Sequence, residues 1–365
     1  MTKRESNILK CVAIMLMLFH HLFMYAAEPY YPALVYGPLL SNPWRLASAG
    51  QLSKLCVTLF VFITAYGTTK SYLRDDMSND GRLAEKSTQR LVKLLVNFQL
   101  VYVIALALCP LGGKNWFTLY SPSRLENLAY AFFDFMGLSY ILQTPSYNSA
   151  WWYMSFAITL VLLLPWLIKL CRRTGAYVLL PGLLLVRWLG VEFVLFRYLL
   201  ITLLGIVLAE YGTVERVKDW YDRAMLPVKA GVLLFCLGVT GAVSVLWLRA
   251  GDNLLDIYEA LLCLPVSLLT LLVPGRIPYV NRTAEFVGRH SMNMFFIHAF
   301  IYQNWFYDFT YSLKYPALIY LFLFASSLAA SVLIEQLKKW LRVEELTRWI
   351  SNRLCRLLVR QAETV

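Results

Sequence analysis

The histidines are the side chains best suited to chemistry, because all of them lie in or beside long apolar segments rather than in polar loops. An ionisable side chain inside a membrane-spanning segment generally faces the bundle interior or a water-filled cavity and marks a functional site. Burial favours the neutral imidazole, which can accept a proton. For each ring the alternative is a hydrogen bond that joins two helices, and this alternative weighs most for the first of the set. The set is His20, His21, His290 and His298.

The first apolar run places a cation and an imidazole on one side of a helix. Lys10 and His21 are eleven residues apart, and steps of about 100° bring them to nearly the same face, with His21 roughly 16 Å farther along the axis. If Lys10 marks the cytoplasmic edge, His21 lies near the middle of the bilayer. His20 is rotated from His21 by about 100°, so the two rings cannot share one ion, and we predict no metal site.

A second segment repeats this arrangement from a basic edge at Arg289. Ser291, Phe295 and His298 follow at four- and three-residue spacing and therefore form one stripe. His298 lies roughly 14 Å deeper than Arg289. We therefore expect His298 and His21 at the same level of the membrane.

Two further cations begin another apolar helix, in the sequence STQRLVKLL. Arg90 and Lys93 are three residues apart and share a helix face. Alone they are ordinary basic anchors at a membrane edge. Together with Lys10 they would surround the cytoplasmic mouth of a cavity that contains histidine, and such a mouth suits a ligand that bears phosphate groups.

Composition places these residues in a membrane protein. Of the 365 residues 59% are hydrophobic and only 15% are charged, and the mean hydropathy is +0.56. Apolar stretches that can cross a hydrocarbon core of about 30 Å predict an all-α polytopic bundle of about ten transmembrane helices. The predicted spans are residues 8–26, 55–72, 91–111, 150–169, 176–191, 196–211, 227–248, 254–274, 286–306 and 315–337.

The basic residues orient this bundle. With the N-terminus inside, most of the 34 Lys and Arg residues fall in the predicted inner segments, as the positive-inside rule requires. Both termini are therefore predicted to be cytoplasmic. The net charge of +12 follows from this topology, so it does not predict binding to nucleic acid.

No linker rich in Gly, Pro or Ser divides the chain, and we predict one membrane domain over residues 1–337. Residues 338–365 place leucines and tryptophans at near-helical spacing among Lys and Arg. This pattern predicts a basic amphipathic helix on the anionic inner leaflet, and a solvated tail is the alternative. Outer segments near residues 28–53 and 112–149 are expected to form a cap, the second with a partly inserted or re-entrant helix.

Several motifs, taken in order, resemble the acyltransferase-3 family of integral-membrane acyltransferases. Lys10 and His21 match the family's basic residue, ten residues and histidine, with Lys in place of the commoner Arg. The sequence RLVK, residues 90–93, is similar to the family's Arg-x-x-Arg, with Lys93 in second place. AWWYMSFAITLVLLLPWL, residues 150–167, resembles a middle helix led by Trp-Tyr. A motif of Gly-x-x-Ser followed by His is matched by Gly288, Ser291 and His298.

One segment departs from the family pattern. LFVFITAYG, residues 59–67, corresponds to a Phe-rich segment that ends in Ser-Gly before an aromatic residue. Thr64 and Ala65 replace Ser-Gly here. We expect this change to alter close helix packing or contacts with the acyl group.

The resemblance implies transfer of an acyl group, in the first place acetyl from acetyl-CoA, to a hydroxyl of a glycan, lipid-linked sugar or glycoside at the outer face of a bacterial cell membrane. Lys10, Arg90 and Lys93 would bind the phosphates of the cytoplasmic donor. His21 would act as the general base or as a transient acyl acceptor. Ser291 and His298 would orient the reacting groups. The acceptor side would be lined by Trp151, Trp152 and Tyr153.

Three questions stay open in the sequence. Some family members carry an extracytoplasmic hydrolase-like domain, and here such a partner would be a separate chain. A transporter or flippase would also place polar groups at the midplane, but the inverted repeats or paired broken helices typical of that class are not seen in the sequence. An inactive relative that binds partners is a further alternative. Asp256 and Glu259 either assist an imidazole or lie at the outer interface.

Overall fold

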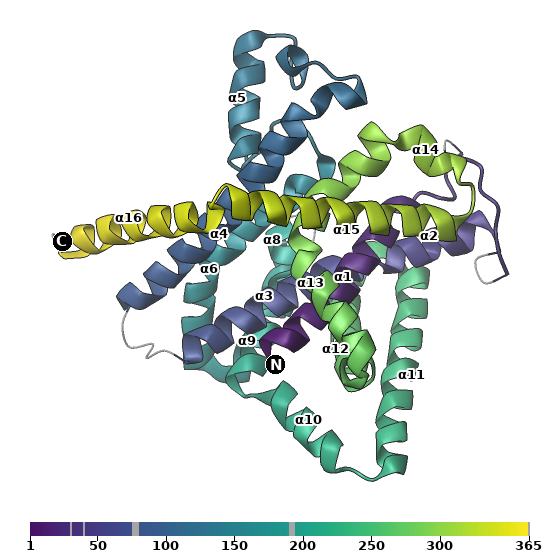
Figure 1. Ribbon diagram of the computed structural model, residues 1–365. Coiled ribbons are helices and arrows are strands. Elements are labelled where there is room, and N and C mark those ends of the chain that lie inside the picture. Colours follow the sequence, from purple (N-terminus) through teal and green to yellow (C-terminus); the bar gives the residue numbers. More distant parts are fainter. Residues whose placement is uncertain (30, 39–40, 75–79, 190–193, 364–365) are drawn as a thin grey trace. The chain divides into compact units, whose positions relative to one another are not determined.

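A computed structural model of the chain describes residues 1–29, 31–38, 41–74, 80–189 and 194–363 (Figure 1). Small parts of the predicted outer segment 28–53, of the span 176–191 and of the tail 338–365 lie outside the described residues. The chain is 83% helical and the described residues contain no strand, which confirms the all-α prediction. The helices fall into two compact units, Met1–Asp75 with Trp166–Ser291 and Asp76–Pro165 with Met292–Val365.

Seven helical runs of the described residues are long and apolar enough to cross a membrane. One of them, Ser149–Leu189, covers two predicted spans, 150–169 and 176–191. The cytoplasmic placement of the two termini stays a prediction. The seven runs are Lys3–Phe23, Pro43–Leu73, Arg82–Ala107, Ser149–Leu189, Leu226–Ala250, Leu255–Arg276 and Pro316–Trp340.

Two predicted spans correspond to helices outside these seven. Residues 196–211 contain the short apolar helix α9 (Leu199–Glu210). Residues 286–306 coincide with the end of α13 (Pro278–Ala299) and with the π-helical turn that follows, Phe300–Trp305. The first part of α13 carries Arg282, Glu285 and Arg289, so the helix is not apolar enough over its length to count among the seven. Within the described residues each predicted span therefore coincides with helical structure.

In the first unit, α1 begins with a capping box. The Thr2 hydroxyl accepts a hydrogen bond from the Glu5 amide at 3.2 Å, and the Glu5 carboxylate accepts one from the Thr2 amide at 2.7 Å, which satisfies two otherwise unpaired donors. The helices of this unit are α1 (Lys3–Phe23), α2 (Pro43–Leu52), α3 (Leu55–Leu73), the end of α6 (Trp152–Thr174), α7 (Leu179–Leu189), α8 (Val194–Arg197), α9, α10 (Thr213–Arg223), α11 (Leu226–Ala250), α12 (Leu255–Leu272) and most of α13.

Helices α3 and α9 approach closely at a glycine. A methyl carbon added to Gly205 of α9 would lie 3.1 Å from the Ala65 methyl group and 3.3 Å from the Phe62 carbonyl oxygen. Small residues at such contacts let two membrane helices pack backbone to backbone. Ala65 therefore lies at a close contact that Gly205 of the facing helix permits, and the effect of the departure from Ser-Gly stays a prediction.

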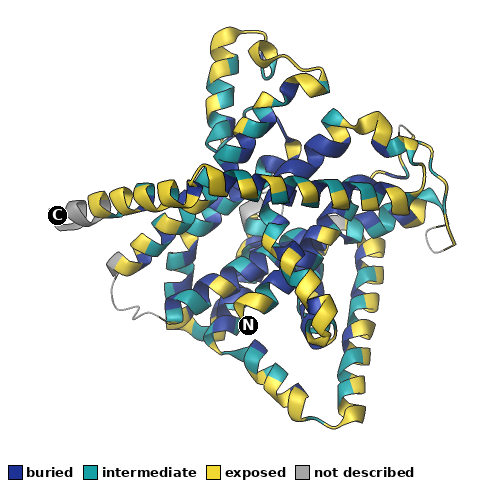
Figure 2. Cartoon of the chain, viewed as in Figure 1, coloured by how far each residue is buried: buried dark blue, intermediate teal, exposed yellow. Residues whose placement is uncertain are grey.

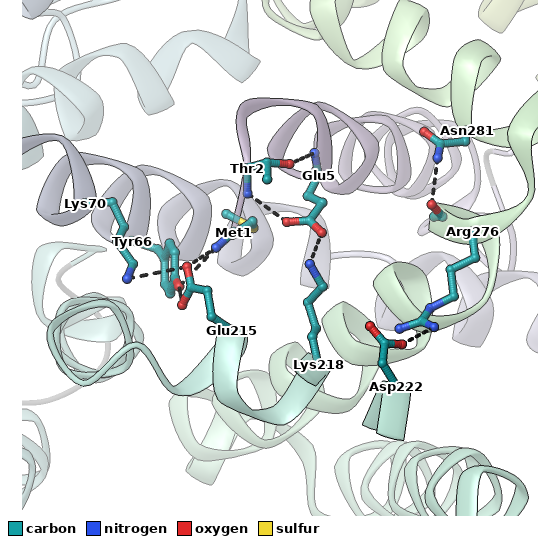
Figure 3. Close-up of polar contacts among 11 residues, drawn as sticks. Met1, Thr2, Glu5, Tyr66, Lys70, Glu215, Lys218, Asp222, Arg276 and Asn281 are labelled. Atoms are coloured by element: carbon teal, nitrogen blue, oxygen red, sulfur yellow. Dashed lines mark hydrogen bonds and ion pairs between the residues drawn. The ribbon is translucent and has the colours of Figure 1, made fainter. Parts of the chain in front are cut away.

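Helix α10 crosses the ends of three neighbouring elements through one polar face (Figure 3). Glu215, Lys218 and Asp222 recur at three- and four-residue spacing and so lie on that face. Burial alone would raise the pKa of Glu215, but hydrogen bonds from the Met1 amino group and the Tyr66 hydroxyl lower the pKa to about 2. The partners of this face are Tyr66, Lys70 and Met1 for Glu215, Glu5 for Lys218, and Arg276 for Asp222.

The second unit holds the predicted outer segment 112–149 and the C-terminal helices. α16 packs against α4 within this unit, and its Cys355 thiol lies 3.9 Å from the Glu85 carbonyl oxygen. The placement of α16 on a lipid surface stays a prediction. The elements are α4 (Asp80–Ala107), short turns at Cys109–Gly112, Trp116–Thr118 and Ser149–Trp151, α5 (Arg124–Phe135), the start of α6, the end of α13 with its π-helical turn, α14 (Tyr307–Ser312), α15 (Pro316–Trp340) and α16 (Val343–Glu363).

Two long helices expose much of their apolar surface. Only 17% of the most apolar window of α11 is buried, and only 28% of that of α15. Figure 2 shows exposed and half-buried residues along both helices. Apolar surface of this extent is stable where it faces lipid rather than water, as expected for a multi-pass membrane protein.

Candidate functional site

His21 lies in the last turn of α1 and is half-buried. Lys10 lies on the same helix and is also half-buried, and the eleven-residue spacing puts the two residues on nearly one face. The neighbouring ring of His20 is 5.2 Å from that of His21, measured between centroids. The depth of His21 in the bilayer stays a prediction.

His20 is buried and serves as a link between helices. Its Nδ1 lies 2.8 Å from the carbonyl oxygen of Gly50 in α2, and a carbonyl only accepts, so Nδ1 carries the proton. A methyl carbon added to Gly50 would lie 2.6 Å from the Met24 amide nitrogen, so α2 and the end of α1 are in backbone contact. His20 thus makes the hydrogen bond between two helices that the sequence analysis gave as the alternative to a functional role.

His298 is fully buried in the second unit, on the last turn of α13. Its Nδ1 lies 2.7 Å from the carbonyl oxygen of Phe295, three residues earlier. Because this carbonyl can only accept, Nδ1 donates, and in the neutral ring the lone pair is on Nε2. The ring also stacks on Tyr302, with centroids 6.2 Å apart and planes 20° apart. A neutral His298 in this tautomer can accept a proton at Nε2.

Gly288 explains the position of two predicted site residues in the first unit. A methyl carbon added to Gly288 would lie 1.7 Å from the carbonyl oxygen of Asn7, so the backbones of α13 and α1 touch at this point. Lys10 is three residues after Asn7, and Ser291 is three residues after Gly288. Ser291 is buried, with 4% of its surface exposed. The glycine of the Gly-x-x-Ser motif therefore brings the helix of Ser291 against the helix of Lys10.

The other two predicted cations lie on α4 in the second unit. Arg90 is half-buried and Lys93 is exposed. A third cation, Lys338 of α15, repels Lys93 electrostatically. Sequence reasoning missed Lys338 because it grouped this residue with the tail. The structure shows it only 8% exposed.

Lys338 is held by two side chains. Its ammonium group donates to Asn293 Oδ1 and to Glu335 Oε1, each at 2.8 Å, and Asn293 Nδ2 also donates to Glu335 Oε1 at 2.7 Å. Asn293 is 2% exposed. The i,i+3 spacing of Glu335 and Lys338 was the available sequence signal for this pair.

Asp256 and Glu259 of α12 form ion pairs with arginines inside the first unit. Asp256 pairs with Arg187 of α7, and Glu259 pairs with Arg197 of α8 and accepts a hydrogen bond from Thr58 at 3.1 Å. The side chains of Asp256 and Glu259 are 0% and 1% exposed. A charge buried in a membrane bundle requires such a partner. The sequence analysis left two alternatives for these carboxylates, help to an imidazole or a position at the outer interface. Neither alternative predicted their ion pairs with arginines.

Trp151 lies in a buried aromatic cluster of the second unit, with 1% of its surface exposed. Its indole Nε1 donates to the Phe296 carbonyl oxygen at 3.1 Å. Trp152 and Tyr153 are half-buried, and the Tyr153 ring lies 5.4 Å from that of Phe295. The predicted aromatic trio thus adjoins the helix of His298, although its place on an acceptor side stays a prediction.

The predicted site residues are of types that can accept a proton or bind an anion. Among the described residues no group of three His, Cys, Asp or Glu could hold a metal ion. His298 offers a nitrogen base of fixed tautomer, and His21 lies on one helix with Lys10. Arg90 and Lys93 are three residues apart on α4 and so share a helix face.

Comparison with known proteins gives one match. A family model described as an acyltransferase domain matches residues 4–336, which is nearly the whole chain. No curated protein and no solved structure matches. The matched range includes every site residue that the sequence predicted.

Proposed function

This chain belongs to the acyltransferase-3 family of membrane acyltransferases, and on that premise we propose that it moves an acetyl group from cytoplasmic acetyl-CoA to a sugar hydroxyl. The acceptor is a glycan, lipid-linked sugar or glycoside at the outer face of a bacterial cytoplasmic membrane. The observation that carries this proposal is the family match over residues 4–336. The positions of Lys10, His21, Ser291 and His298 within that range support it.

The donor is recognised by cations. Acetyl-CoA carries several phosphate charges, and Lys and Arg bind phosphate through charge-assisted hydrogen bonds. Lys10 is half-buried on the helix of His21, and Arg90 and Lys93 present a paired basic face on α4. In this proposal they hold the nucleotide end, while the pantetheine arm carries the thioester to the histidine.

The transfer is a displacement at the thioester carbonyl. As general base, His21 removes the proton of the acceptor hydroxyl while that oxygen attacks the carbonyl carbon. The carbon–sulfur bond then breaks, and the proton passes to the departing thiolate. If His21 is instead the nucleophile, its nitrogen attacks the carbonyl carbon, the carbon–sulfur bond breaks and CoA leaves as the thiolate. The acceptor hydroxyl then attacks the acyl-imidazole, the carbon–nitrogen bond breaks, and the hydroxyl proton passes to the released imidazole. Ser291 and His298 orient the reacting groups in either case.

The test uses purified protein in detergent with radiolabelled acetyl-CoA and a panel of glycan acceptors. His21→Ala is expected to lower transfer about 100- to 10,000-fold, the usual contribution of a general base, with folded protein near wild-type abundance. The matched control is His290→Ala, since His290 contacts the Phe286 ring at 4.7 Å and has no role in the proposal. Full transfer by His21→Ala contradicts the assignment, and a wild-type protein that consumes no thioester points to the transporter class.

A further inference from the structure

Asp134 is a buried carboxylate outside the predicted site, at the end of α5 in the second unit. It is 0% exposed, and both of its oxygens are fully engaged. Oδ1 accepts hydrogen bonds from the Ser139 and Ser146 hydroxyls at 2.9 and 2.8 Å. Oδ2 accepts from the Tyr120 hydroxyl and the Tyr147 amide, each at 2.8 Å. One side chain therefore ties together three separate stretches of the outer segment.

The environment of Asp134 holds its carboxyl group in one position. Burial raises the pKa of Asp134, and the hydrogen bonds from Tyr147, Ser146, Tyr120 and Ser139 counter that rise. These four contacts come from three hydroxyls and one amide, and together they fix the direction of the carboxyl group. A buried network of this kind has value when it fixes one geometry, because apolar residues could otherwise fill the same space at less cost.

Two routes lead from Asp134 to the indole of Trp151. Tyr147, whose amide binds Asp134, places its ring 6.3 Å from Trp151 and 4.7 Å from Phe300. Tyr120, whose hydroxyl binds Asp134, lies 2.9 Å from the Tyr102 hydroxyl, and the Tyr102 ring is 5.7 Å from Trp151. The indole is therefore held from two directions by residues that the carboxylate organises.

Trp151 acts on the helix that carries His298. Its indole N–H binds the carbonyl oxygen of Phe296 at 3.1 Å, two residues before His298. From Phe300 the chain is π-helical, and such turns within α-helices are frequent at functional sites. Trp151 therefore supplies a side-chain hydrogen bond at the point where the backbone changes its pattern, next to the Phe295 carbonyl that fixes the His298 tautomer.

We propose that Asp134 is a positioning residue for His298, acting through Tyr147, Trp151 and the Phe296 carbonyl. The kinetic part of this inference rests on the proposed function, in which His298 orients the reacting groups. The geometric part concerns the His298 ring alone. The ring would keep its direction only while the outer segment is folded around Asp134, which couples that segment to the reacting centre.

Two substitutions test the chain of contacts at its ends. Asp134→Asn keeps the size of the side chain, but its amide nitrogen cannot accept the hydrogen bonds that the lost oxygen held. Trp151→Phe removes the indole N–H and keeps an aromatic ring in the cluster. The matched control is Glu126→Gln, which removes an exposed carboxylate of the same helix, α5, whose contact is the Ser121 hydroxyl.

The first readout does not depend on activity. The chain has only four histidines, so ring-nitrogen NMR of histidine-labelled protein resolves them, and His298→Ala identifies the His298 signal. Asp134→Asn and Trp151→Phe should shift or split that signal and leave the His20 signal unchanged, which also reports that the first unit is folded. Glu126→Gln should change neither. A His298 signal that Asp134→Asn leaves in place overturns the proposal.

The second readout is kinetic. Losing one oriented hydrogen bond of about 1–1.5 kcal/mol corresponds to roughly a tenfold fall in kcat for Trp151→Phe, with KM for acetyl-CoA within about twofold of wild type. In a His298→Ala background, Asp134→Asn should cause no further loss, because both act through one ring. Independent, multiplying losses contradict the proposal. A wild-type protein without turnover refutes the proposed function instead, and the NMR result still decides the geometry.

Discussion

Replacing Gly288 by alanine tests how the first unit sets the distance between α1 and α13. The added carbon would lie 1.7 Å from the Asn7 carbonyl oxygen and 2.6 Å from its carbonyl carbon. A carbon–oxygen contact needs about 3.3 Å, so the helices must separate locally by roughly 1.6 Å. Backbone lies on both sides of the contact, and no side chain can rotate away to make room.

The size of the effect follows from this geometry. Overpacking a core costs about 1–3 kcal/mol, and we expect the upper end because backbone has to move. With an unfolding entropy of about 2.1 cal/mol/K per residue over 365 residues, a loss of about 3 kcal/mol lowers Tm by about 4 °C. Lys10 and Ser291 each lie three residues from the contact, and a displacement of about 1 Å at a reacting site can cost about 100-fold in rate.

Thermal unfolding in detergent and consumption of acetyl-CoA measure the two effects separately. The matched control is Gly238→Ala in α11, where an added methyl carbon meets nothing within 4 Å, and alanine there should be neutral or slightly stabilising. If Gly288→Ala unfolds at the wild-type temperature, the backbones of α1 and α13 do not touch at Asn7 and Gly288. If it is destabilised but keeps full turnover, the crossing does not set the reacting geometry.

Three further predictions concern charges outside this contact. Glu215, whose pKa falls from 4.5 to about 2, should stabilise the fold fully above pH 4.5 and lose that contribution as pH falls toward 2. Because the side chain is partly exposed, the contribution is discounted to about 1 kcal/mol. The dependence of Tm on pH should therefore be weaker in Glu215→Gln than in the wild type. Glu259→Gln leaves the Arg197 charge in a buried site without its carboxylate and should cost about 3 kcal/mol, read as Tm against the exposed control Asp308→Asn. Lys338→Met leaves Asn293 Oδ1 without its ammonium donor and should cost about 1–3 kcal/mol in the same assay.

Much of the helical architecture could be predicted from apolar length alone. Hydropathy located α1, α3, α11 and α15 because each contains a long apolar stretch with few charged residues. It was least informative at α13, where polar residues occupy the first half of the helix. That half of α13 is in backbone contact with α1, and the hydropathy of one segment carries no information about contacts with another helix.

Within the candidate site, sequence spacing predicted which residues share a helix but not their partners across helices. The stripe from Ser291 to His298 needs only the helical repeat. The pairing of Asp256 with Arg187 joins α12 to α7, across 69 positions of sequence, and spacing within one helix carries no information about it. The same limit applies to Gly205 of the facing helix α9, which lies close to Ala65.

The hydrogen bonds of the histidines separate structural from chemical roles better than their location in apolar segments does. His20 donates to Gly50 on another helix, so its bond holds α1 and α2 together. His298 donates to Phe295 on its own helix, and a bond within one helix orients a ring without joining two helices. Both bonds fix the proton on Nδ1 and leave the lone pair of the neutral ring on Nε2. The bond to Gly50 gives His20 a packing role, and a ring oriented by its own helix is consistent with the orienting role proposed for His298.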